Sequence, residues 1–224
     1  MIAPALPSDE SSRLEALHGY EILDTASEEV FERITTMAAR LFDVPIAVIS
    51  LVDTNRQWFK SCYGLDADQT DRKVAFCAHA ILSPKTLVVP DARLDIRFAN
   101  NPLVTGEPHI RFYAGALLRT QDGRNIGTLC LIDHRPRSFS AGQQAHLEDM
   151  AQITMHQIEL RLVAQKLVEA KQALRQAHDE LETRVAERTV ELARVNRALQ
   201  DEMLERKQAE KMLLVLNQSH VNES

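Results

Sequence analysis

Cys77 and His79 are the two residues of this sequence whose types and spacing most readily suggest catalysis. A thiol and an imidazole close in space could act as a nucleophile and its base, or as two ligands of a metal ion. The short apolar segment 76–82 is predicted to be a helix, and residues two apart on a helix point in different directions. We therefore predict no shared catalytic or metal site. Cys77 is expected to pack inward, because free cysteine is among the most buried residue types.

The other two thiols belong to Cys62 and Cys130, which are widely spaced and form no CxxC motif with Cys77. Three cysteines in this arrangement are typical of reduced thiols in a cytoplasmic protein. No set of nucleophile, base and orienting group is evident, so the chain is predicted not to be an enzyme. A thiol-based redox enzyme acting through Cys77 stays open as an alternative, and it would need a lowered thiol pKa.

Alternating acidic and basic residues follow a short strand that is expected at 87–89. Asp91, Arg93, Asp95 and Arg97 precede Phe98 in a long connection that continues to residue 108. Loops of this length inside a domain are often functional lids. Charged loop residues are also commonly solvated, so two interpretations stay open: a polar lid over a small ligand, or an ion-paired surface loop.

The elements that position these residues are predicted from apolar runs and turn residues. Strands are expected at 46–52, 57–63, 110–118 and 126–132, with turns at 53–55 and 121–123 and a polar loop at 65–73. Two hairpins without strict βαβ alternation predict an α+β fold, in which an antiparallel sheet is flanked by helices.

A helix is predicted between the polar residues 24–29, which resemble a helix start, and Pro45, which forbids its continuation. The residues expected on its inward face are Val30, Ile34, Met37, Ala38 and Leu41. Residues 1–22 are expected to form an arm and a short helix ahead of it.

A seven-residue repeat of apolar side chains dominates the C-terminal third. The first stripe is Ile153, Leu160, Leu167, Leu174 and Leu181, and the second is Val163, Ala170 and Ala177. Ser140 is expected to cap this helix, and neither glycine nor proline follows Gly142. A helix can bury so narrow a seam only against another helix. We therefore predict a long C-terminal helix that forms a parallel homodimeric coiled coil over residues 161–216, with a tail at 217–224.

Length and charge set further limits. The 224 residues suffice for one domain of about 150 residues and the long helix. The net charge of −6 lacks the basic excess of nucleic-acid-binding proteins. The chain contains no apolar run of about 18 residues and no signal peptide. We therefore expect a cytoplasmic protein that binds neither nucleic acid nor membrane.

Five stretches resemble the GAF domains of bacterial signalling proteins. They are residues 45–53 (PIAVISLVD), 57–61 (QWFKS), 76–81 (FCAHAI), 112–116 (FYAGA) and 127–133 (GTLCLID). They follow one another in the order that is typical of that family. The resemblance assigns residues 23–160 to a GAF sensor domain.

The resemblance also implies where a small ligand would bind, namely between the sheet and the segment 76–98. The lining residues that it implies are Trp58, Cys77, Asp91, Phe98, Tyr113 and Cys130. It identifies neither the ligand nor a cofactor, and no metal site is expected. Trp58 and Tyr113 are also typical core residues. A GAF domain without a ligand, used only for dimerisation, is the alternative.

Residues 187–189 (ERT) lie in a heptad-rich stretch that resembles the signalling helix between sensor and output domains. This resemblance implies a two-component or related role, with a histidine kinase, diguanylate cyclase or PAS-linked output domain, or a partner kinase, downstream. The apolar stripe passes from Leu181 to Val185 by a second successive step of four residues, a stutter that locally unwinds a supercoil. Signal transmission is therefore predicted at Leu181, Val185, Glu187, Arg188 and Thr189.

Overall fold

The computed structural model describes the backbone of residues 1–221 and the side chains of residues 1–212. The chain divides into two compact units, residues 1–164 and 165–224. The first unit contains the sheet, and the second contains the greater part of the last helix, α5 (Ala141–Val221). Residues 222–224, at the end of the predicted tail, lie outside the described residues.

A six-stranded antiparallel sheet forms the centre of the first unit, in the order β3-β2-β1-β6-β5-β4. The strands are β1 (Ile46–Val52), β2 (Arg56–Tyr63), β3 (Gln69–Asp71), β4 (Leu87–Val89), β5 (Phe112–Arg119) and β6 (Asn125–Asp133). The predicted α+β class is confirmed, and five of these strands fall where they were predicted. The exception is β3, which lies in the segment 65–73 that was predicted to be a polar loop. Its residues are polar and show no apolar pattern, so no strand was predicted there.

The central strands are buried on both faces, which produces two hydrophobic cores. Along β1, Ala47 and Ile49 belong to the first core, whereas Val48 and Val52 belong to the second. Because side chains alternate across a strand, neither face of β1 is left for solvent. Two separate layers of chain must therefore cover this sheet.

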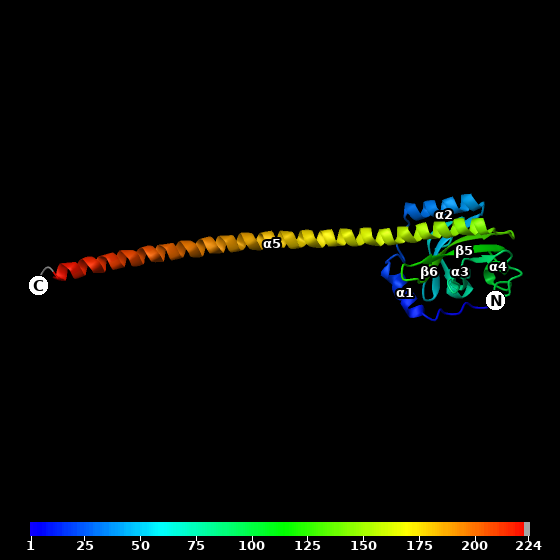
Figure 1. The fold of residues 1–224 in the computed structure, drawn as a ribbon, viewed down its shortest axis with the longest axis horizontal. Helices are drawn as coiled ribbons and strands as arrows, with labels where there is room; N and C mark the ends of the chain where they lie inside the picture. Colours follow the sequence, from blue (N-terminus) through cyan, green and yellow to red (C-terminus); the bar gives the residue numbers. More distant parts are fainter. Residues whose placement is uncertain (222–224) are drawn as a thin grey trace. The chain divides into compact units, whose positions relative to one another are not determined.

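Helices cover the first core, and a mixture of short helices and loops covers the second. The helices are α1 (Glu10–Gly19), α2 (Glu29–Phe42), the 3-10 helix η1 (Arg72–Val74), α3 (Phe76–Ala80), α4 (Pro102–Thr105) and α5. Figure 1 shows α2 and the first turns of α5 on one face of the sheet, and α3 on the other. The segment between β4 and β5 completes the second cover.

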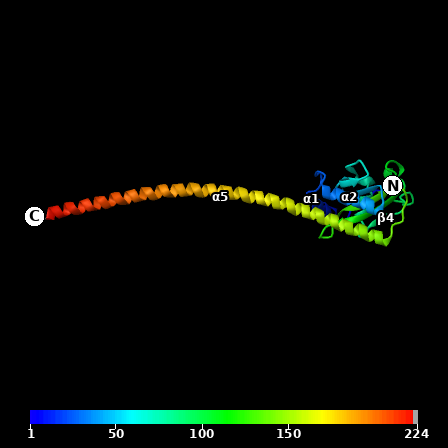
Figure 2. The ribbon, with the colours of Figure 1, turned by 90° about the horizontal axis from the view of Figure 1, so that it is seen from above.

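Ser140 caps the start of α5, as predicted, and Gln143 makes the cap reciprocal. Ser140 Oγ accepts a hydrogen bond from the Gln143 backbone N–H at 3.2 Å, and Gln143 Oε1 accepts one from the Ser140 N–H at 2.9 Å. This pairing satisfies backbone donors that the helix itself cannot. From there α5 continues as one unbroken helix to Val221, which Figure 2 shows in a second view.

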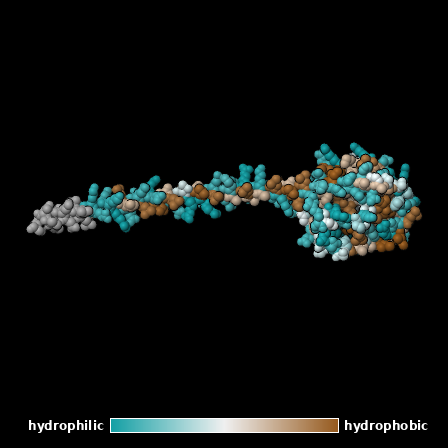
Figure 3. Space-filling model, viewed as in Figure 1, coloured by the Kyte–Doolittle hydropathy of each residue, from teal (hydrophilic) through white to brown (hydrophobic). Residues whose placement is uncertain are grey.

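The second unit exposes a row of apolar side chains along α5. Leu167, Leu174 and Leu181 are all exposed, as are Val185 and Leu192 further along. Figure 3 shows apolar and hydrophilic patches alternating along this helix. Among the described residues, no helix combines the length and the apolar composition that are needed to cross a bilayer.

The inward face of α2 differs from the predicted one. The structure exposes Val30, Met37 and Leu41, and buries Phe31 and Phe42. Of the predicted face, only Ile34 and Ala38 are buried. The helix carries two apolar stripes, and the one with two aromatic rings is turned inward because it removes more apolar area from water.

The two stripes of α2 predict losses of very different size for two truncations. Phe31→Ala should lower the free energy of unfolding by about 3–5 kcal/mol, because it leaves a cavity in the first core. Met37→Ala should change it by less than about 0.5 kcal/mol, because that side chain is already exposed. Urea unfolding followed by the fluorescence of Trp58, the sole tryptophan and a member of the same core, measures both. Equal losses for the two variants would contradict this assignment of the face.

Candidate functional site

Two buried thiols meet beneath α3 in the second core. Cys77 on α3 and Cys130 on β6 place their Sγ atoms 3.7 Å apart, and each residue is 1% exposed. The hydroxyl of Tyr113 on β5 donates a hydrogen bond to Cys77 Sγ at 3.3 Å. Three polar groups that are distant in the sequence therefore form one cluster within the second core.

Gly115 allows Tyr113 to reach this cluster. A Cβ atom at position 115 would lie 2.2 Å from the Tyr113 hydroxyl oxygen, so the phenol ring crosses the space that a side chain would occupy. Gly115 also faces Cys130 in the β5–β6 register. The absence of a side chain at this one position thus lets the ring lie along the strand and point its hydroxyl at the thiols.

The cluster favours a thiolate on Cys77. Burial alone would raise the pKa of Cys77, but the contact with the Cys130 thiol and the hydrogen bond from the Tyr113 hydroxyl lower it below its usual value. The hydrogen bond to Cys77, together with burial, raises the pKa of Cys130. Burial, followed by the charges of the two thiols, raises the pKa of Tyr113. Cys77 is therefore the thiol that ionises first.

A small cavity adjoins this cluster. It has a volume of about 40 Å³, and its lining includes Cys77, Tyr113, Gln57 and Thr70. Gln57 Oε1 and Thr70 Oγ1 are buried without a hydrogen-bond partner among the described residues. The volume exceeds the roughly 10–15 Å³ that one water molecule requires, but metabolite sites usually measure about 300–1,000 Å³. In this conformation the cavity accepts only molecules of a few atoms.

The structure brings together four of the six predicted lining residues. Cys77, Phe98, Tyr113 and Cys130 all belong to the second core. Phe98 stacks on Phe76 of α3, with ring centroids 3.9 Å apart and planes 8° apart. The predicted position of these four on one side of the sheet therefore agrees with the structure, while ligand binding by them stays a prediction.

Trp58 and Asp91 lie elsewhere. Trp58 belongs to the first core, because neighbouring residues of a strand face opposite sides and Phe59 faces the second. Asp91 does not line the small cavity; its carboxylate forms an ion pair with Arg93 at 2.7 Å. These two residues therefore do not share one pocket with the other four.

The connection after β4 is an ion-paired loop fastened by the N-terminal arm. Asp95 pairs with Arg97 at 2.6 Å, in the same manner as Asp91 with Arg93. The Ile2 N–H donates to the Arg97 carbonyl at 3.1 Å, and the Ile2 carbonyl lies 3.1 Å from His79 Nε2. His79 thus contacts the arm and not Cys77, as its predicted orientation requires.

Trp58 instead borders an open groove of about 780 Å³ beside β2. Acidic and basic side chains share its lining, among them Glu32, Arg56, Lys60 and Asp68. The Lys60 ammonium is enclosed and bonded to the Thr25 hydroxyl, the Ala26 carbonyl and the Glu28 carboxylate at 2.7–2.9 Å. These hydrogen bonds of Lys60 therefore fix the segment before α2 against β2.

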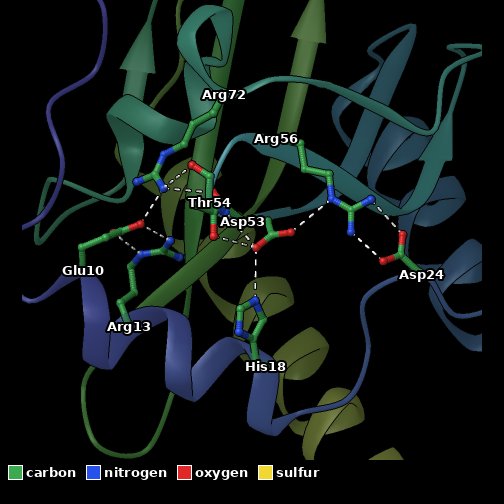
Figure 4. A network of polar contacts seen from close by, with 8 residues as sticks. All are labelled: Glu10, Arg13, His18, Asp24, Asp53, Thr54, Arg56 and Arg72. Carbon is green, nitrogen blue, oxygen red and sulfur yellow. Dashed lines mark hydrogen bonds and ion pairs between the residues drawn. The ribbon is translucent and has the colours of Figure 1, made fainter.

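A network of charged residues, which the sequence did not suggest, ties α1 to the sheet (Figure 4). Glu10 accepts two hydrogen bonds from Arg13 at 2.8 Å each and one from Arg72 at 2.5 Å. Arg72 also donates to the carbonyl groups of Asp53 and Thr54 in the β1–β2 turn. One carboxylate on α1 therefore joins two guanidinium groups and the turn of the first hairpin.

The same turn is bound from its other side. Asp53 lies 3.2 Å from His18 Nε2 on α1 and 3.1 Å from Arg56 Nε. Arg56 in addition donates two hydrogen bonds to Asp24, at 2.8 and 2.6 Å, in the fork geometry that suits a carboxylate. The network fixes α1 and the segment ahead of α2 against the end of the hairpin.

Comparison with known proteins identifies the kind of domain. Residues 27–162 match the GAF domain family. A stretch of 159 residues, 70% of the chain, is 47% identical to a Pseudomonas aeruginosa protein named cyclic di-GMP phosphodiesterase PA2567. The match covers 27% of that relative, so the chain spans just over a quarter of its length.

Solved structures show the same fold at low sequence identity. The GAF domain of a phosphoenolpyruvate-protein phosphotransferase from Coxiella burnetii has a TM-score of 0.52 and 14% identity, covering 71% of this chain and 99% of that one. The GAF domain of the Acinetobacter phosphoenolpyruvate-protein phosphotransferase has a TM-score of 0.51 and 15% identity, covering 69% and 98%. At these identities the likeness concerns the fold alone.

The charged network predicts a pH-dependent effect for Glu10→Gln. Burial opposes ionisation, but Arg13 and Arg72 lower the pKa of Glu10 to about 2. The stability that this carboxylate contributes is thus complete above its unfolded pKa of about 4.3 and is lost as the pH falls toward 2. The variant should lose about 2 kcal/mol at pH 7, because two buried cations lose their partner.

Unfolding in urea at a series of pH values measures this effect. The difference between the wild type and Glu10→Gln should shrink steadily between pH 4.5 and pH 2. Glu15→Gln, at an exposed position on the same helix, serves as the matched control and should remain near the wild type throughout. A difference that stays constant with pH would show that Glu10 contributes by packing alone.

Proposed function

The chain belongs to the GAF domain family, and from that premise we propose that it is the sensory part of a signalling protein. In this proposal the GAF unit responds to a small ligand or a partner, and α5 transmits the response to an output domain or a partner kinase. The chain itself performs no catalysis. Ligand or partner binding would act by population shift, favouring one packing of a homodimer over another.

The observation that carries this proposal is the continuity of α5 together with its exposed apolar stripe. The first turns of α5 are part of the first core, and the same helix continues into the second unit without a break. Leu174 is 72% exposed in the single chain, and its neighbours in the heptad stripe are exposed as well. A second copy in parallel register would bury this stripe in a coiled coil.

The proposed point of transmission is the stutter between Leu181 and Thr189. Val185, four residues after Leu181, begins the stripe that Leu192 and Leu199 continue. Arg188 pairs with Glu191 at 2.6 Å, and Thr189 donates to the Val185 carbonyl at 2.7 Å. Together with Glu187, these residues place charges close to the apolar seam at the point where its heptad phase shifts. This arrangement supports two packings of the coiled coil with similar energy.

The relative from Pseudomonas aeruginosa supports an output domain that acts on cyclic di-GMP. Its name assigns it phosphodiesterase activity, and the region that matches this chain is a minor part of its length. We prefer such an output domain to a histidine kinase or a PAS-linked output, because the chain is 47% identical to this relative over 159 residues. A diguanylate cyclase would act on the same nucleotide.

A GAF domain used only for dimerisation is the second candidate. The small cavity beside Cys77 favours it, since about 40 Å³ holds no metabolite in this conformation. The two candidates share the dimer and differ in whether a signal enters through the GAF unit. The dimer is therefore tested first, and transmission through α5 second.

The first prediction concerns the dimer. Light scattering at micromolar concentration should give twice the chain mass of 25.3 kDa. Replacing Leu174 and Leu181 together by Glu should give the monomer mass, because the seam would have to bury four carboxylates. Gln172→Glu with Gln176→Glu adds the same charge outside the seam and should leave the dimer intact. A monomeric wild type would refute the proposal.

The second prediction concerns transmission. The chain is joined in place of the matched region to the remainder of the Pseudomonas aeruginosa relative, and hydrolysis of cyclic di-GMP is measured. Deleting residues 184–187 restores one continuous heptad phase, so the fusion should be held in one activity state while its coiled coil melts at a higher temperature.

A deletion of one full heptad, residues 167–173, is the matched control because it shortens the helix without changing the phase. The fusion that carries this control deletion should hydrolyse cyclic di-GMP as the undeleted fusion does. If both deletions leave hydrolysis unchanged, α5 is a spacer and not a transmitter.

A further inference from the structure

The dithiol of Cys77 and Cys130 is a reactive group that the proposed function does not use. Its two sulfur atoms are in contact at 3.7 Å, and both residues are almost fully buried. A disulfide requires a sulfur separation of about 2.05 Å. A modest movement of α3 toward β6 would therefore be enough to join them.

The surroundings prepare one of the two sulfurs for attack. The contact with Cys130 Sγ and the hydrogen bond that the Tyr113 hydroxyl donates at 3.3 Å both stabilise a negative charge on Cys77 Sγ. The thiolate is the nucleophilic form of cysteine. Cys130 is positioned as the second thiol, which keeps its proton until Cys77 has reacted.

The small cavity provides the space for a small reagent. Cys77 forms part of its wall, and Leu65, Leu103 and Pro108 on the same lining are partly exposed to solvent. The unpartnered Gln57 Oε1 and Thr70 Oγ1 give it a polar side that can hold a hydroxyl-bearing molecule. A volume of about 40 Å³ admits a molecule of two or three heavy atoms and excludes most larger oxidants.

We propose that Cys77 and Cys130 are a modification site for hydrogen peroxide, which enters the small cavity and converts this buried dithiol into a disulfide. The site is independent of the output domain and of the coiled coil. It is a stoichiometric modification of the chain and does not make the chain an enzyme.

The chemistry balances in two steps. The Cys77 thiolate attacks one peroxide oxygen, so that an S–O bond forms, the O–O bond breaks, and hydroxide leaves and takes up the proton that Cys77 released, as water. Cys77 is then a sulfenic acid, oxidised by two electrons. The Cys130 sulfur attacks Cys77 Sγ, so that the S–S bond forms, the S–O bond breaks, and the leaving hydroxide takes up the Cys130 proton as water.

The test treats the folded full-length chain with hydrogen peroxide, blocks the remaining thiols under denaturing conditions, and maps the cysteines by mass spectrometry. The expected result is a Cys77–Cys130 disulfide that forms at least about tenfold faster than Cys62 is oxidised. Cys62 is the internal comparison, because burial raises its pKa to about 11. The variant Cys62→Ser should form the disulfide at an unchanged rate.

Two further variants identify the order of the steps. Cys130→Ser should accumulate a sulfenic acid on Cys77 that dimedone traps when the peroxide-treated chain is denatured in its presence, whereas Cys77→Ser should leave Cys130 unmodified at the same peroxide concentration. Trp58 fluorescence verifies that each variant is folded, and Cys77→Ala replaces Cys77→Ser if that variant is not. Oxidation of Cys62 without the disulfide, or a disulfide that forms only in denaturant, would overturn the proposal.

Discussion

The burial of the central strands on both faces is the constraint on which the rest of the structure depends. Every residue of β1 is buried, and β6 is buried along nearly its whole length. Such strands cannot face water on either side, so the chain must supply two covers. The first cover is made of long helices, and the second is made of the short helix α3 and an irregular connection. The two covers differ in character, and the thiols lie beneath the less regular one.

The pattern of apolar runs made most of this fold predictable. The runs at 46–52 and 126–132 and the turn residues between the strands located both hairpins, and the heptad repeat located α5. The inward face of α2 was not predictable in the same way, because two apolar stripes competed for it and only packing against the sheet decided between them. β3 was not predictable from apolar runs, because it is a short polar strand at the edge of the sheet.

The candidate site was predictable only in part. Cys77, Tyr113 and Cys130 were expected on one side of the sheet, but their mutual contact depends on Gly115, a residue with no chemistry of its own. The alternation of residues along β2 would have placed Trp58 opposite Phe59 and thus away from the cleft. The bond from Arg72 to Glu10, 62 residues apart, could not be read from the sequence, because no local spacing links two such charges. The position of Gln57 in the cavity wall was not predictable either, since a single amide side chain in a strand does not by itself indicate a binding site.

The two edges of the sheet have a consequence for the protein at high concentration. β3 and β4, which end the sheet on either side, are only three residues long. An exposed strand edge is a template on which another chain can add a strand, and short edges leave little length for such pairing. In the proposed dimer each sheet would experience a high local concentration of the other for as long as the dimer persists. Short edge strands suit such a domain, because they reduce strand-to-strand aggregation between the two copies.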